Sequence, residues 1–276
     1  MSAPTWIETR TADGSWTLVH AGLNEGCHSL AGAWQQATER YARACRLEES
    51  ARAAADGRVR LLDLGTGLGL NLAAALVSVE GAGGRLEALS LELEPAVLVA
   101  GCALYERAEL AQGPWAAPHA EVRRALRAAL AGDGRAGLGR GTLELRLGDA
   151  RATLPDPPRT FEAVFLDPFS PGRAGELWEP GFLARVAALL APGGWLSTYS
   201  AAFRVRLALA AAGLEVGQGA RVGTKGEGTL ARREAPVPPL PPRVSARLRR
   251  RLAGAQQRPG GPVLGIPLSE QRAGFD

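Results

Sequence analysis

The chain has 276 residues, 46% of them hydrophobic, and a formal net charge of +4 at neutral pH. This length supports one large domain with small extensions. The three cysteines, Cys27, Cys45 and Cys102, lack the close spacing of a disulfide framework or a zinc site. No apolar run approaches the roughly 18 to 20 residues of a membrane span, and no signal-peptide pattern opens the chain. We therefore expect a cytoplasmic protein without a metal site, and the slight basic excess mildly favours a polyanionic partner.

The first 57 residues predict a small N-terminal extension. An apolar, β-branched stretch from Ser15 to Val19 follows the turn signal Asp13-Gly14 and is typical of a strand. A helix is expected from about Leu30 to Leu47 because apolar residues recur there at helical spacing.

Residues 58–234 predict an α/β domain of the Rossmann-like type. Strands expected at Val59–Leu64 and Leu86–Leu91 are each followed by a helix, at Leu70–Val79 and Pro95–Leu104. This alternation indicates a parallel sheet. Further elements are expected as strands at Leu143–Leu147, Phe161–Leu166 and Gly194–Tyr199 and a helix at Phe203–Ala212.

Two regions depart from this alternation. Residues 105–141 are rich in Ala and Arg and predict a helical insertion. Leu214–Val222 and Gly228–Arg232 suit a C-terminal antiparallel hairpin, so we expect a mainly parallel sheet of seven strands. Residues 235–276 begin with a proline-rich run and continue with a basic run, which favours a tail. The spacing of Val244, Leu248 and Leu252 equally permits an amphipathic helix docked on the body.

The strongest motif is Asp63-Leu64-Gly65-Thr66-Gly67-Leu68-Gly69, between an expected strand and an expected helix. Glycines at such a turn allow a ligand to approach the backbone closely. The G-x-G-x-G spacing differs from the dinucleotide pattern G-x-G-x-x-G and resembles the first motif of class I methyltransferases. An ordinary tight turn between strand and helix is the alternative.

Two other strand ends carry acidic residues. Glu92 ends its strand beside the expected glycine loop, where a carboxylate can accept hydrogen bonds from ribose hydroxyls, and Glu94 competes for this role. Asp149 follows the next strand of the sheet. Its position resembles the acidic residue that lies near the adenine in class I methyltransferases, and it can also cap the following helix.

The segment Asp167-Pro168-Phe169-Ser170-Pro171 ends the expected strand Phe161–Leu166. Carboxylate and carbonyl oxygens there can hold the hydrogens of an amine, and an aromatic face tolerates positive charge developing on nitrogen. The segment resembles the Asp/Asn-Pro-Pro-Tyr/Phe motif of amine-directed methyltransferases. Asp167 and Phe169 are thus the candidate catalytic residues, with Asp167 either accepting a proton or orienting the amine. A proline-rich turn without function is the alternative.

Residues 11–234 together resemble the methyltransferase half of the bifunctional bacterial MnmC family. The segments that carry this resemblance are Glu25-Gly26-Cys27-His28-Ser29, Gly65-Thr66-Gly67-Leu68-Gly69-Leu70-Asn71, Phe165-Leu166-Asp167-Pro168-Phe169-Ser170-Pro171, Leu177-Trp178, Pro192-Gly193-Gly194, Thr198-Tyr199-Ser200-Ala201-Ala202 and Lys225-Gly226-Glu227-Gly228-Thr229.

The resemblance implies methylation by S-adenosylmethionine of the aminomethyl group on the wobble uridine of tRNA, giving 5-methylaminomethyl-2-thiouridine. It implies a cofactor site formed by Asp63, Gly65, Gly67, Gly69, Asn71, Glu92, Asp149 and Asp167. It implies a substrate site formed by His28, Ser29, Pro168, Trp178, Tyr199 and Lys225. Core packing is the alternative for Tyr199 and a structural role for His28. FAD is not expected, because no oxidase half follows in this sequence.

Two other functions stay open. The acceptor can be an amine on a small molecule or a protein, since class I folds support many acceptors. A second alternative is an RNA-binding protein that keeps the fold without catalysis, and an intact glycine loop with Glu92 argues against it.

Overall fold

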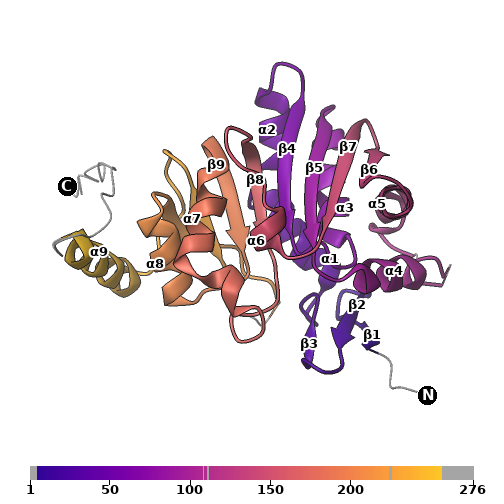
Figure 1. Ribbon diagram of the computed structural model, residues 1–276, viewed down its shortest axis with the longest axis horizontal. Helices are drawn as coiled ribbons and strands as arrows, with labels where there is room; N and C mark the ends of the chain where they lie inside the picture. The colour runs from indigo at the N-terminus through magenta and orange to yellow at the C-terminus, as the bar shows by residue number, and fades with distance from the viewer. Residues whose placement is uncertain (1–4, 108, 111, 224–225, 257–276) are drawn as a thin grey trace.

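A computed structural model describes residues 5–107, 109–110, 112–223 and 226–256, and within them the main sheet has eight strands (Figure 1). In spatial order the strands are β10 (Glu215–Gln218), β11 (Thr229–Arg232), β9 (Leu190–Thr198), β8 (Phe161–Leu166), β4 (Arg58–Leu64), β5 (Arg85–Glu92), β7 (Gly141–Leu147) and β6 (Arg135–Leu138). The strands β9, β8, β4, β5 and β7 run parallel. The expected Rossmann-like α/β fold is confirmed.

The parallel strands are buried on both faces, which explains their nearly continuous apolar sequences. Along β4, Val59 and Leu61 contribute to one hydrophobic core, whereas Leu62 and Leu64 contribute to the other. This alternation follows from the two-residue period of a strand. Each face is therefore covered by helices.

The helices that cover the first face are α1 (Ala33–Gln35), the π-helix η1 (Gln36–Arg43), α2 (Leu47–Ala53), α3 (Leu70–Gly81), α4 (Pro95–Leu104) and α5 (Ala116–Ala131). Those that cover the second are α6 (Ala150–Thr153), the 3-10 helix η2 (Gly175–Trp178), α7 (Pro180–Ala188) and α8 (Phe203–Ala211).

The sheet has one strand more than the seven expected, because the insertion 105–141 is not purely helical. It contains helix α5, and Arg135–Leu138 forms β6, which pairs antiparallel with β7. Leu138 lies opposite Gly141, so a two-residue loop closes the hairpin, and its first residue, Gly139, has a φ of 54°. Such tight hairpin loops favour glycine.

The N-terminal extension forms its own three-stranded sheet. It consists of β1 (Trp6–Arg10), β2 (Trp16–His20) and β3 (Glu25–Gly26), and Figure 1 shows it below the large sheet, at the opposite end from α2. The single helix expected at Leu30–Leu47 is wrong in detail. It is divided into α1, η1 and α2, with a break at Arg46, which has a φ of 50°.

The C-terminal part packs on the body. Strand β10 pairs antiparallel with β11, and the amide of Gln218 in β10 donates to the carbonyl of Pro238 at 3.1 Å. Helix α9 (Pro242–Gln256) follows in the region expected as a tail and lies against α8 at the edge of the molecule (Figure 1). Leu248 is buried, and the Arg247 guanidinium lies 4.0 Å from the Phe203 ring centroid. The amphipathic-helix alternative therefore holds for these residues.

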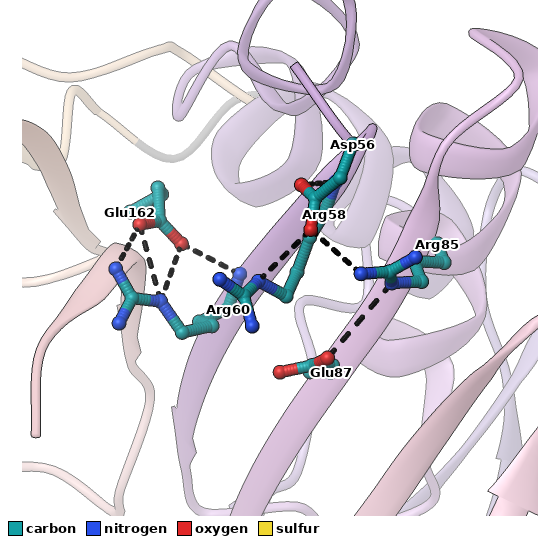
Figure 2. A network of polar contacts seen from close by, with 6 residues as sticks. All are labelled: Asp56, Arg58, Arg60, Arg85, Glu87 and Glu162. Carbon is teal, nitrogen blue, oxygen red and sulfur yellow. Dashed lines mark hydrogen bonds and ion pairs between the residues drawn. The ribbon is translucent and has the colours of Figure 1, made fainter. Parts of the chain in front are cut away.

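A network of charged side chains occupies the amino ends of β4, β5 and β8 (Figure 2). Arg60 pairs with Glu162, while Asp56 pairs with Arg58 and Arg85, the latter at 2.6 Å. These side chains are about one-third to one-half exposed, so each pair adds little stability. The carboxyl ends of the same strands lie at the opposite edge, where α/β sheets bind ligands.

Candidate active site

A cavity of about 640 Å³ lies at the carboxyl ends of the parallel strands. The residues of the main sheet that line it include Gly65 after β4, Glu92 at the end of β5, Asp149 after β7 and Asp167 after β8. Residues 23–30 of the N-terminal extension line it as well. This volume is within the range of small-molecule sites, about 300 to 1,000 Å³.

The glycine loop leaves backbone exposed to the cavity. Gly65 and Gly67 have φ values of 86° and 53°, and a Cβ on Gly65 would lie 2.7 Å from the carbonyl oxygen of Asp167. The carboxylate of Glu92 accepts hydrogen bonds from the amide of Gly67 at 2.9 Å and from that of Glu94 at 3.0 Å. Burial raises the pKa of Glu92 above its ordinary value. Glu92 and Glu94 both line the cavity, and Glu92 also orders the loop.

Three predicted cofactor residues do not line the cavity. Asp63 is fully buried and accepts a hydrogen bond from Ser90 Oγ at 3.1 Å. Gly69 immediately precedes α3 and has a φ of 82°, and a Cβ there would lie 2.9 Å from Val122 of α5. Asn71 donates from Nδ2 to Asp167 Oδ2 at 2.8 Å. Asp63 thus lies within β4, Gly69 packs against α5, and only Asn71 of the three bonds directly to a cavity-lining residue.

Asp149 is both a cavity-lining residue and a helix cap. It lines the cavity, and its side chain caps α6 by accepting from the amide of Arg151 at 2.8 Å. The Arg151 guanidinium pairs with the same carboxylate at 2.6 Å. Hydrogen bonds from Arg151 lower the pKa of Asp149, which keeps this carboxylate ionised at neutral pH.

Asp167 lines the cavity directly after the end of β8. Burial raises the pKa of Asp167 to about 7, although the hydrogen bond from Asn71 and the positive charge of Arg40 act in the opposite direction. A carboxyl group with this pKa exchanges a proton near neutral pH, whereas an ordinary aspartate is too weak a base for that exchange.

The residues after Asp167 are held by aromatic side chains. Tyr199 Oη donates to the carbonyl of Pro168 at 2.9 Å, and Trp178 Nε1 donates to the carbonyl of Phe169, also at 2.9 Å. The rings of Trp178 and Tyr199 meet edge to face at 5.8 Å. Pro168, Phe169 and Tyr199 line the cavity, while Trp178 is buried behind its wall. The sequence predicts that Trp178 contacts the substrate, but this residue does not line the cavity. It instead holds the backbone of Phe169 through its indole hydrogen bond.

The N-terminal extension contributes directly to the cavity. His28 and Ser29 line it, His28 Nδ1 lies 3.1 Å from Thr17 Oγ1, and the Ser29 amide donates to Gln36 Oε1 at 2.8 Å. Burial lowers the pKa of His28 to about 4, so its ring is neutral at physiological pH. Lys225, the remaining predicted substrate residue, lies outside the described residues.

The cavity also contains Trp6, Gln36 and Arg40, which no motif in the sequence predicts. The Trp6 ring stacks on that of Phe169, with centroids 6.3 Å apart. Gln36 and Arg40 are buried and lie four residues apart on η1. Two polar residues at this spacing on an otherwise apolar helix face are the signal that identifies them.

The mainly parallel sheet, the glycine loop and the acidic strand ends around one cavity define a class I methyltransferase that uses S-adenosylmethionine. Residues 119–234 match the family described as S-adenosyl-L-methionine-dependent methyltransferase. The structure resembles MnmC2 from Aquifex aeolicus with a TM-score of 0.74 and 31% identity, covering 90% of this chain and 76% of that one. The chain belongs to the MnmC-like methyltransferase family, as the sequence motifs predict.

Curated relatives agree with this assignment. The tRNA 5-methylaminomethyl-2-thiouridine biosynthesis bifunctional protein MnmC from Methylibium petroleiphilum is 37% identical over 77% of this chain. The protein of that name from Pseudomonas aeruginosa is 35% identical over 70% of it. The chain spans about a third of the length of these relatives, 33% and 28% respectively.

Within the described ranges 5–107, 109–110, 112–223 and 226–256, no group of three or more His, Cys, Asp or Glu residues is arranged to hold a metal ion. Among the helices that the structure describes, none combines the length and the apolar character needed to cross a membrane.

Proposed function

We propose that this chain transfers the methyl group of S-adenosylmethionine to the aminomethyl nitrogen of the tRNA wobble uridine, converting 5-aminomethyl-2-thiouridine to 5-methylaminomethyl-2-thiouridine. The observation that carries the proposal is that Asp167, Pro168 and Phe169 line the same cavity as Gly65 and Glu92. The names of the MnmC relatives, which state 5-methylaminomethyl-2-thiouridine biosynthesis, support the choice of acceptor.

The residues present fit the cofactor. Gly65 and Gly67 present their backbone to the cavity, and a Cβ at position 65 would collide with the carbonyl oxygen of Asp167. Glu92 and Asp149 offer carboxylates to the ribose and the adenine. When bound, S-adenosylmethionine supplies an electrophilic methyl group on a sulfonium. Asp63, Gly69 and Asn71 do not touch the cofactor in this proposal. Asp63 stabilises the end of β4, Gly69 allows α3 to begin after the glycine loop, and Asn71 holds Asp167.

Asp167 accepts the proton of the acceptor amine in this proposal. A free alkyl amine has a pKa of about 10 and is mostly protonated near neutral pH, so methylation requires loss of a proton. The pKa of Asp167, raised to about 7 by burial, brings its basicity closer to this task. Asn71 orients the carboxylate through its hydrogen bond. The ring of Phe169 stabilises the positive charge on nitrogen.

The other predicted substrate residues surround the acceptor in this proposal. His28 and Ser29 contact it from the N-terminal extension, and Tyr199 and Pro168 from the side of the main sheet. Trp178 keeps Phe169 in place through its hydrogen bond to the Phe169 carbonyl. Lys225 stays a prediction.

A tRNA partner is also supported by the surface charge of α9. Its sequence contains no acidic residue, and Arg249 and Arg250 are exposed, as phosphate contacts require. We place the protein in the cytoplasm, where its acceptor is found, and the three free cysteines agree with a reducing compartment.

The test uses labelled S-adenosylmethionine and total tRNA from a strain lacking this methyltransferase. The wild type and Asp167→Asn are compared, with Asp156→Asn as a control at an exposed position. After digestion to nucleosides, the label should appear in 5-methylaminomethyl-2-thiouridine and be lost in Asp167→Asn alone. If the cofactor binds but no tRNA nucleoside is labelled, the acceptor is wrong and small-molecule and protein amines are tested next. Absence of cofactor binding would favour a non-catalytic RNA-binding protein.

A further inference from the structure

Arg40 is a buried cation in the wall of the cavity. Its residue is 2% exposed, and it lines the cavity from η1. In the described parts of the chain no carboxylate lies within 4.0 Å of its guanidinium. Its hydrogen bonds go to neutral backbone carbonyls, those of Ala220 at 3.2 Å and Gly226 at 3.0 Å. Asp167, whose pKa the charge of Arg40 lowers, lies beyond ion-pair distance. A buried guanidinium without a direct ion pair is costly, so this arrangement favours an anion in the ligand.

The guanidinium retains donors for such an anion. Nε and Nη2 make the bonds to Ala220 and Gly226, while Nη1 donates to no residue that the structure describes. The backbone of Arg40 is fixed as well, because Ser197 Oγ of β9 donates to its carbonyl at 2.6 Å. Arg40 is thus fixed at the cavity wall, and its Nη1 group is left to donate to a ligand. A planar guanidinium with free N–H donors is suited to binding a carboxylate.

Arg40 lies on the opposite side of the glycine loop from Glu92 and Asp149, the residues proposed to bind adenosine. The sheet order β11-β9-β8-β4-β5-β7 places Asp149 and Glu92 on one side of the glycine loop. Arg40 is bonded to β9 and to the loop between β10 and β11, on the other side. S-adenosylmethionine carries its adenosine and its amino acid at opposite ends, and the α-carboxylate is its single anionic group.

We infer that Arg40 binds the α-carboxylate of the amino-acid part of S-adenosylmethionine. The inference rests on the orientation of the cofactor in the proposed function, with adenosine at Glu92 and Asp149. It adds a residue from the N-terminal extension to the cofactor site, so the extension is part of the methyltransferase rather than an appendage to it. By holding the amino acid, Arg40 sets the position of the sulfonium relative to Asp167.

Calorimetric titration with two ligands tests this without any methyl acceptor. S-adenosylhomocysteine carries the α-carboxylate, and S-adenosyl-3-thiopropylamine is the same molecule without it. The wild type should bind the first about 10 to 100 times more tightly, as a charge-assisted pair predicts. In Arg40→Met this ratio should fall to about 1, and Arg40→Lys should keep part of it.

Matched controls separate recognition from a general loss of structure. Arg43→Met changes an exposed arginine of the same helix and should keep the wild-type ratio. Damage to the fold in Arg40→Met would weaken both ligands alike, whereas loss of a carboxylate contact weakens S-adenosylhomocysteine alone. Equal affinity of the wild type for both ligands, or an unchanged ratio in Arg40→Met, would overturn the inference. Failure of S-adenosylhomocysteine to bind the wild type would overturn the proposed function with it, whereas failure to methylate tRNA would leave this inference standing.

Discussion

The carboxylate of Glu25 accepts two hydrogen bonds from Ser170, one from its backbone amide at 2.7 Å and one from its Oγ at 2.8 Å. Glu25 belongs to β3 of the small sheet, and Ser170 follows the segment Asp167–Phe169 after β8. Residues 145 positions apart in the chain are thereby joined beside the cavity. The contact fixes the N-terminal extension to the loop that carries the candidate catalytic residues.

We expect Glu25 and Ser170 to be energetically coupled. A hydrogen bond to a charged acceptor contributes about 1.5 to 3 kcal/mol when buried, and these two bonds are only partly buried. Glu25→Ala should therefore lower the free energy of unfolding by about 2 kcal/mol in total. Ser170→Ala removes one of the two bonds and should cost less. In a double-mutant cycle measured by denaturant unfolding, the coupling energy should be about 1 kcal/mol. Strictly additive effects would mean that the contact does not stabilise the fold.

The sequence predicts the parts of the site that local patterns specify. Phe161–Leu166 and Pro95–Leu104 are found with the expected bounds, because a short apolar run suits a buried strand and a proline is favoured in the first turn of a helix. The cavity-lining positions of Gly65, Glu92 and Asp167 follow from their places at strand ends, since parallel strands end at one edge.

Contacts between distant segments are what the patterns miss. Trp178 lies behind the wall because the turn after β8 brings the carbonyl of Phe169 to its indole nitrogen. Arg40 reaches the cavity because η1 packs on the same face of the sheet as α3. The spacing of Gln36 and Arg40 within η1 marks them as unusual, but only the topology shows that Arg40 faces the cavity and that Trp178 lies behind its wall.

Gly65 and Gly69 should respond differently to alanine. At Gly69 a Cβ meets side chains of α5, so Gly69→Ala should lower stability by about 1 to 3 kcal/mol and leave cofactor affinity nearly unchanged. At Gly65 the Cβ meets the backbone of Asp167 at 2.7 Å, so Gly65→Ala should also weaken S-adenosylhomocysteine binding at least about tenfold. Gly81→Ala is the control, since nothing lies within 4 Å there. Thermal unfolding and calorimetry measure the two effects, and equal loss of binding in both variants would contradict the assignment.

Burial of Asp63 should make stability depend on pH. Its pKa rises from 3.8 to about 7 through burial, so the folded chain binds this proton more tightly than the unfolded chain. The resulting stabilisation is complete below about pH 4 and is lost as the pH rises through 7. Asp63→Asn lacks this proton equilibrium. Its free energy of unfolding relative to wild type should therefore increase by roughly 2 to 4 kcal/mol between pH 4 and pH 8.

Denaturant unfolding at a series of pH values measures this difference. Asp133→Asn, at an exposed turn, is the control for the chemical change from carboxylate to amide. A constant difference between Asp63→Asn and wild type across the range would refute the prediction.

The raised pKa of Asp167 should be visible in the rate of methyl transfer. Below pH 7 its carboxyl group is protonated and cannot accept the proton of the amine, so kcat/KM should rise with pH through about 7. Asp167→Asn should lower kcat/KM by about 100-fold or more and remove the inflection near pH 7. A variant that keeps this inflection would assign it to another group. Cofactor affinity, measured in parallel, shows whether the change concerns the chemical step.

Substitution should show which of Glu92 and Glu94 binds the ribose of the cofactor, because both line the cavity and both are candidates for this contact. Glu92 uses its two carboxylate oxygens to accept from the amides of Gly67 and Glu94. In Glu92→Gln one of these acceptors becomes a donor, so the glycine loop or the turn before α4 loses its partner. S-adenosylhomocysteine affinity should fall about 10- to 100-fold. Glu94→Gln changes a side chain without such bonds and should alter affinity by about threefold or less. A larger loss in Glu94→Gln than in Glu92→Gln would transfer the ribose contact to Glu94.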